Sequence, residues 1–122
     1  MLDRIEITGF HMDVNDDLRK YVIKKIGKLD KYMPKRARES AHAEVKLKSS
    51  SNKGKSQYTC EVVLTLPKGT INTKETTLNI FAAVDIVETK LKNQIRRYKS
   101  QHSVLRGHTR HLIDKFRSQS SD

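Results

Sequence analysis

The sequence reads Ala41-His-Ala-Glu-Val-Lys-Leu-Lys48 and, after a polar connection, Gln57-Tyr-Thr-Cys-Glu-Val-Val-Leu-Thr-Leu66. Apolar residues recur at every second position in both stretches, and this period of two is typical of strands with one buried face. The connection, residues 49–56, is rich in Ser and contains Gly54, so we expect a flexible hairpin connection between antiparallel strands. The residues expected to face the core are Ala41, Ala43, Val45, Leu47, Tyr58, Cys60, Val62, Leu64 and Leu66.

The residues before this hairpin predict one strand and one helix. Residues 2–9 alternate apolar and polar side chains up to Gly9, which we expect to end the strand. In residues 15–33 the apolar side chains recur at steps of three and four, which is typical of a helix with one buried side. Asn15 is a suitable N-cap for this helix, and Pro34 marks its end.

The residues after the hairpin predict a fourth strand and a second helix. Residues 70–77 are rich in Thr and follow a turn, and Asn79 caps a helix that runs to about Gln101. The element order is therefore β-α-β-β-β-α. Since each helix has one apolar side and each strand one apolar face, we expect an α+β fold with two helices packed on one face of a four-stranded sheet.

The positive charge of the chain is concentrated in two segments. The chain has 122 residues and a formal net charge of +11 at pH 7, which fits one small domain with an anionic partner. Residues 18–38 hold nine basic residues and one acidic residue, and residues 86–122 hold nine basic and three acidic, whereas residues 39–85 have a net charge of only +1. Both basic segments contain a predicted helix, so side-by-side helices would join them into one strip. Such a strip suits a phosphate backbone or an anionic membrane surface.

Helical geometry assigns the basic residues of this strip to faces. The two flanks of the second helix carry Lys92, Arg96 and Lys99 on one side, and Lys90 and Arg97 on the other. The outer face of the first helix carries Lys20, Lys24 and Lys31, with Lys28 to one side. We expect residues 1–101 to form the binding domain and residues 102–122 to form a basic tail, either flexible or a helical extension.

Several classes of protein and site do not fit the sequence. No apolar run approaches the roughly 18 residues of a membrane helix, and the single Cys60 gives neither a disulfide framework nor a multi-cysteine zinc site. His108 and His111 have no carboxylate or cysteine nearby to complete a metal site. We find no nucleophile with its base and no glycine-rich phosphate loop. We therefore expect neither catalysis nor a cofactor, metal or small-molecule substrate, and a reduced, bacterial-type cytoplasm.

The common RNA-binding modules are also missing. The sequence has no Gly-x-x-Gly clamp of a KH domain, no helix-turn-helix or zinc-finger signature, and too few aromatic residues for a stacking platform. What remains is recognition of a structured RNA by shape and charge, mainly through its phosphates.

Two stretches of the chain match the pattern of a known family. The first is Ile5-Glu-Ile-Thr-Gly9 with Val14-Asn-Asp-Asp-Leu-Arg-Lys-Tyr21 and Lys28-Leu-Asp-Lys-Tyr32. The second and more specific stretch is Leu78-Asn-Ile-Phe-Ala-Ala-Val-Asp85, running into Lys90-Leu91 and Gln94-Ile-Arg-Arg-Tyr-Lys99. Over residues 4–100 the chain thus resembles the ribosome hibernation promoting factors, also called ribosome-associated inhibitors and sometimes labelled sigma-54 modulation proteins.

This resemblance implies a fold, an activity and a set of contact residues. The fold would be similar to a double-stranded RNA-binding domain with an added first strand. The activity would be to occupy the mRNA and tRNA channel of the small ribosomal subunit, at the A and P sites, and to keep ribosomes inactive under stress. A monomer off the ribosome is expected. The residues implied to contact RNA are Lys24, Lys25, Lys28, Lys90, Arg96, Arg97 and Lys99, to which the basic strip adds Lys92.

The sequence departs from the family pattern at three places. Asn79 stands where the family usually has Asp, and both residues cap helices. Phe81 stands where the family usually has Tyr, which removes a hydroxyl. Residues 101–122 are too few for the C-terminal domain through which long family members pair two ribosomes.

Two other functions stay open at this point. The chain would be a protein-interaction regulator of transcription if it bound a protein partner and this binding persisted after RNase treatment. It would be a generic double-stranded RNA binder if it bound any A-form duplex as well as it bound the ribosome.

Overall fold

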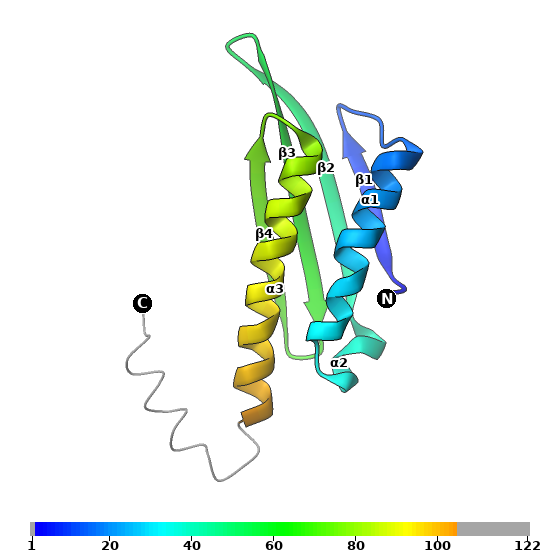
Figure 1. The fold of residues 1–122 in the computed structure, drawn as a ribbon, viewed down its shortest axis with the longest axis vertical. Coiled ribbons are helices and arrows are strands. Elements are labelled where there is room, and N and C mark those ends of the chain that lie inside the picture. Colours follow the sequence, from blue (N-terminus) through cyan, green and yellow to red (C-terminus); the bar gives the residue numbers. More distant parts are fainter. Residues whose placement is uncertain (1, 105–122) are drawn as a thin grey trace, which may run out of the picture.

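Figure 1 shows two layers, a four-stranded sheet and two long helices that lie side by side across one of its faces. The structure is a computed structural model, and it describes residues 2–104. Its elements are β1 (Ile5–Phe10), α1 (Asp16–Gly27), a 3₁₀ segment η1 (Lys28–Tyr32), α2 (Lys35–Ser40), β2 (His42–Asn52), β3 (Lys55–Leu66), β4 (Gly69–Thr77) and α3 (Ile80–Val104). The α+β fold with its helices on one face, as predicted from the sequence, is confirmed.

The sheet has the strand order β1-β2-β3-β4. β1 runs parallel to β2, and the β2–β3 and β3–β4 pairs are antiparallel, as the hairpin pattern predicted. The β2–β3 pairing is unbroken from His42 opposite Thr65 to Asn52 opposite Lys55. Positive φ angles of 55° at Lys53 and 80° at Gly54 close this hairpin with a two-residue turn. The connection expected as a flexible loop over residues 49–56 is therefore mostly regular strand.

The core lies between the helices and one face of the sheet. α1 contributes Leu18, Val22 and Ile26, α3 contributes Val84, Val87, Leu91 and Ile95, and the sheet contributes Val45, Leu47, Cys60, Val62 and Leu64, all at most 2% exposed. The side chains between these positions on each strand face the other side, where no helix covers them in the described part of the chain (Figure 1). The sheet therefore has one covered and one open face.

The first predicted helix differs from the structure at its end. The α-helix stops at Gly27, a buried residue whose carbonyl accepts a hydrogen bond from the Leu2 N–H at 3.0 Å, and the chain continues to Tyr32 as a 3₁₀ segment. Pro34 then precedes the short α2, which the sequence analysis missed because its six residues show too little periodicity. At the other end of the chain α3 extends past residue 101 to Val104, and the rest of the predicted tail lies outside the described residues.

Gly9 was expected to end the first strand but lies inside β1, opposite Leu47. A Cβ atom at Gly9 would lie 2.5 Å from the backbone oxygen of Met12 and 3.0 Å from Val14 Cγ2. The glycine is thus needed because the loop after β1 folds back closely over the strand.

We expect Gly9→Ala to lower the free energy of unfolding by about 1–3 kcal/mol, because the Met12 backbone must move to admit a methyl group. Thr8→Ala is the control, since Thr8 is exposed in the same strand, and it should change stability by less than about 0.5 kcal/mol. Urea unfolding at pH 7 measures both. Equal stability of the two variants would contradict the close approach.

Candidate nucleic-acid interface

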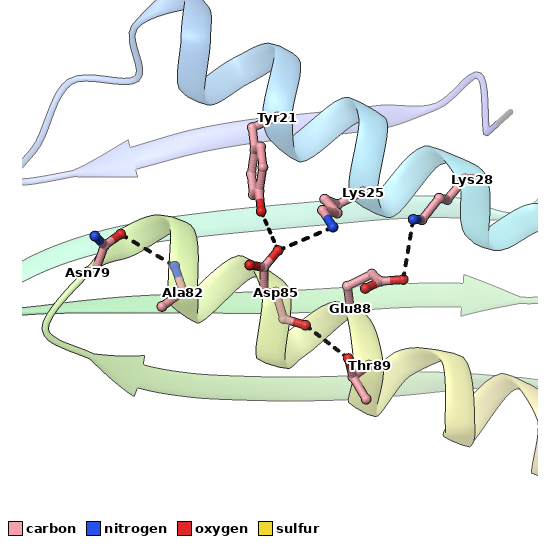
Figure 2. A network of polar contacts seen from close by, with 8 residues as sticks. All are labelled: Tyr21, Lys25, Lys28, Asn79, Ala82, Asp85, Glu88 and Thr89. Carbon is pink, nitrogen blue, oxygen red and sulfur yellow. Dashed lines mark hydrogen bonds and ion pairs between the residues drawn. The ribbon is translucent and has the colours of Figure 1, made fainter.

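A shared carboxylate joins α1 to α3 near the start of α3 (Figure 2). The Tyr21 hydroxyl of α1 donates a hydrogen bond to Asp85 Oδ1 of α3, and Lys25 Nζ lies 3.5 Å from the same oxygen. The Tyr21 ring also packs edge-on against Phe81, with ring centroids 5.1 Å apart. Asp85 therefore accepts a hydrogen bond from one side chain of the neighbouring helix and forms an ion pair with another, so it links the two helices.

The Tyr21–Asp85 hydrogen bond changes the acidity of the tyrosine. It raises the pKa of Tyr21 from the ordinary 10.0 to about 12, with smaller contributions from burial and from the negative charges of Asp85 and Glu88. A phenolate beside a carboxylate is unfavourable, so the protonated hydroxyl is kept well above neutral pH.

Two more ion pairs occupy lysines that the sequence analysis assigned to RNA. Lys28 Nζ lies 4.0 Å from Glu88 Oε2, and Lys90 Nζ lies 2.6 Å from Glu75 Oε1 of β4. The hydrogen bond from Lys90 lowers the pKa of the half-buried Glu75 carboxyl. Together with Lys25, three of the eight predicted contact residues thus have carboxylate partners, which partly neutralise their charge.

Three cations gather around one aromatic ring at the other end of the helix pair. Lys92 Nζ and Arg96 Cζ of α3 lie 5.9 and 5.2 Å from the centroid of the Tyr32 ring, and Lys31 Nζ of η1 lies 5.2 Å from it. Within residues 2–104 none of the three forms an ion pair with a carboxylate. We call these four residues the Tyr32 cluster. Cation–π contacts hold its positive groups together without neutralising them.

The remaining predicted contact residues are exposed cations. Lys24 lies on the outer side of α1, and Arg97 and Lys99 lie on α3. In the described part of the chain none of these three has an ion-pair partner. The predicted flanks of α3 are also confirmed for three residues, because Lys92 and Arg96 approach Tyr32 while Lys90 turns to β4.

Lys31 and Tyr32 are not among the contact residues predicted from the sequence. Lys31 was placed on the outer face of the first helix and Tyr32 lies in the family pattern, but neither signal shows that α3 approaches them. The contact joins residues about 60 positions apart in the sequence, and only the packing of η1 against α3 reveals it.

Other kinds of site find little support in residues 2–104. No group of three or more His, Cys, Asp or Glu side chains is arranged there to hold a metal ion. Cys60 is buried between the sheet and the helices, and burial raises the pKa of its thiol to about 12. Among the helices described, none is both long and apolar enough to cross a membrane.

Residues 5–103 match the family model described as sigma 54 modulation protein / S30EA ribosomal protein. The chain belongs to this family. A relative in it is the ribosome hibernation promotion factor of Staphylococcus aureus (strain COL), which is 35% identical over 98 residues, covering 80% of this chain and 49% of the relative. The chain thus spans about half the length of that curated relative.

Two solved structures support the fold of this S30EA family member. The Protein Y N-terminal domain of Thermus thermophilus superposes with a TM-score of 0.60 at 26% identity, covering 80% of this chain and 99% of that one. A ribosomal subunit interface protein from Coxiella burnetii gives a TM-score of 0.64 at 26% identity, covering 80% and 98%. The resemblance inferred from the two sequence stretches is therefore confirmed at the level of family and fold.

We expect Asp85→Asn to lower the pKa of Tyr21 from about 12 towards 10.0, because the amide carries no charge and is a weaker acceptor. Phenolate absorbance measured against pH, minus the profile of Tyr21→Phe, isolates this residue. Glu88→Gln is the matched control and should shift the titration less, since Glu88 is the smallest cause. Identical titrations of parent and Asp85→Asn would contradict the hydrogen bond.

The same bond gives stability a defined pH dependence. Since the folded-state pKa lies above the unfolded value, the contribution of Tyr21 is fully present below pH 10 and is lost as the pH rises towards 12.

Proposed function

We propose that this chain binds the small ribosomal subunit through ribosomal RNA, in the mRNA and tRNA channel at the A and P sites, and so keeps ribosomes inactive under stress. The proposal is supported by membership of the S30EA family and by the names of its relatives, a ribosome hibernation promotion factor and a ribosomal subunit interface protein. Occupation of the channel would suffice, so the proposed mechanism requires no catalytic step and no cofactor.

The observation that carries the proposal is the Tyr32 cluster. Its three cations converge on one ring from η1 and α3, and within residues 2–104 none of them has a carboxylate partner, so their charge is available to an anion. A phosphate group suits this arrangement, because the planar Arg96 guanidinium can donate two parallel hydrogen bonds while the lysines supply charge. The cluster would therefore fix one segment of the RNA backbone against the helix pair.

The other predicted contact residues extend this surface with different strength. Lys24, Arg97 and Lys99 are free to neutralise phosphates directly, whereas Lys25, Lys28 and Lys90 would first have to leave a carboxylate. We assign the main contacts to the Tyr32 cluster with Lys24, Arg97 and Lys99, and secondary contacts to the three paired lysines. Residues 1–101 would be the ribosome-binding domain, acting in the cytoplasm and monomeric off the ribosome.

We expect the double variant Lys92→Gln, Arg96→Gln to bind small subunits about 10- to 100-fold more weakly at moderate salt. Each phosphate contact that the variant lacks means that one counterion fewer is released from the RNA on binding. Its plot of log affinity against log salt should be shallower by about two. The control is Lys46→Gln, Lys74→Gln, which removes the same charge from the open face of the sheet. Sucrose-gradient sedimentation at several salt concentrations measures both.

The channel assignment has its own readout in the same gradients. Added tRNA should displace the parent protein from the small subunit and from whole ribosomes. Equal salt slopes for the two double variants would contradict the role of the Tyr32 cluster. Ribosome binding that tRNA leaves unchanged would contradict the A and P sites, and a partner that survives RNase would favour a protein-interaction regulator instead.

A further inference from the structure

We propose that the end of the β2–β3 hairpin is a second RNA contact, separate from the Tyr32 cluster. The segment concerned is residues 50–57, which we call the hairpin extension. This inference rests on the proposed binding of ribosomal RNA and adds a second place on the protein where that RNA is held.

The hairpin extension projects beyond the rest of the sheet. Going along the chain, β2 pairs with β1 up to Lys48, and β3 pairs with β4 from Tyr58 onward. Beyond them, Ser50 pairs only with Gln57, Ser51 with Ser56 and Asn52 with Lys55. Figure 1 shows the resulting two-stranded ribbon reaching past the ends of β1, β4 and α3.

The side chains of the extension do not pack into the hydrophobic core. Its sequence is Ser-Ser-Asn-Lys-Gly-Lys-Ser-Gln, without an apolar side chain, and residues 50–56 are all exposed. A two-stranded hairpin with nothing packed against it is only marginally stable in water. Its length therefore adds little to folding, and a contact with a partner gives a reason for it.

The charge of this region is strongly positive although the wider segment is nearly neutral. The eight residues of the extension contain Lys53 and Lys55 and no acidic residue. The net charge of +1 over residues 39–85 arises because the acidic residues lie on either side of this stretch. Neither Lys53 nor Lys55 has an ion-pair partner within residues 2–104. The extension is thus a third basic region, hidden by averaging along the sequence.

The side chains of the extension favour RNA over a protein partner. Ser hydroxyls and the Asn52 amide are short hydrogen-bonding groups, so the ribbon can come close to phosphates and 2′-hydroxyls while Lys53 and Lys55 supply charge. A protein interface would need buried aromatic or aliphatic anchors, and residues 50–57 contain none. The partner that fits is therefore a nucleic-acid backbone.

The extension is far enough from the Tyr32 cluster to contact a different segment of the RNA backbone. α3 begins three residues after Thr77, the partner of Tyr58, and the extension and the Tyr32 cluster lie in opposite directions from that point. The ribbon rises ~10 Å at about 3.3 Å per residue, and Arg96 lies ~24 Å along α3 at 1.5 Å per residue. Two contacts about 35 Å apart suit two successive grooves of A-form RNA. A double-stranded RNA-binding domain, which contacts two successive grooves, spans about 16 base pairs.

The first test removes the charge of the extension. In Lys53→Asn, Lys55→Gln, asparagine is used at residue 53 because it tolerates the φ of 55° there. We expect about tenfold weaker binding to small subunits at moderate salt, and a salt slope shallower by one to two. The control is again Lys46→Gln, Lys74→Gln, which should keep the parental slope.

The second test keeps the charge and removes the reach. Deleting Ser50, Ser51, Ser56 and Gln57 preserves both lysines, the turn and the in-out alternation, but shortens the ribbon by about 7 Å. We expect the same loss of slope as for the charge variant, with urea unfolding to confirm that the domain folds. A parental slope in either hairpin variant, with the domain folded, would overturn the second contact.

A parallel titration with an A-form RNA duplex of about 20 base pairs separates this inference from the proposed function. If the parent binds the duplex but not the small subunit, the ribosomal role is wrong, and the slopes on the duplex still decide the hairpin contact. If the parent binds neither, both proposals are wrong.

Discussion

The carboxylate of Asp85 allows two basic helices to lie against each other. Only one face of the sheet is covered, so α1 and α3 have to be neighbours although both helices are basic, with net charges of +2 for α1 and +3 for α3. α3 turns Asp85 and Glu88 towards α1, where they meet Tyr21, Lys25 and Lys28 (Figure 2). Each of these half-buried but solvent-accessible pairs contributes about 1 kcal/mol, while apolar burial holds the layers together. The acids remove the repulsion that would oppose this packing.

These pairs divide the seam, the surface along which α1 and η1 meet α3, into two parts. Near the start of α3, Lys25 of α1 and Lys28 of η1 have carboxylate partners, whereas further along α3 the cations around Tyr32 have an aromatic ring and, within residues 2–104, no carboxylate. The seam is thus structural at one end and available to an anion at the other.

The fold could be predicted from the sequence because its elements have clear periods, whereas the pairings across the seam could not. Alternation gave β2 and β3, and steps of three and four gave α1 and α3, but the Tyr21–Asp85 hydrogen bond joins residues 64 positions apart. The α-helix gives way to a 3₁₀ segment after Gly27, whose carbonyl accepts a hydrogen bond from Leu2, and no periodicity reveals this contact. The eight predicted contact residues were chosen by the helix face on which they lie. The helix face does not show whether a lysine forms an ion pair with a carboxylate.

That distinction determines how the net charge of +11 acts on a partner. A lysine that leaves a carboxylate for a phosphate exposes a new negative charge, so its gain is smaller than that of a cation whose only counterions are in solution. In the proposed RNA complex the number of phosphates neutralised would therefore be smaller than the number of basic residues on the protein surface. The basic residues that count most are those for which the fold provides no acid, and in residues 2–104 they include the Tyr32 cluster at one end and Lys53 and Lys55 at the other. The salt dependence of binding measures this subset, and not the total charge.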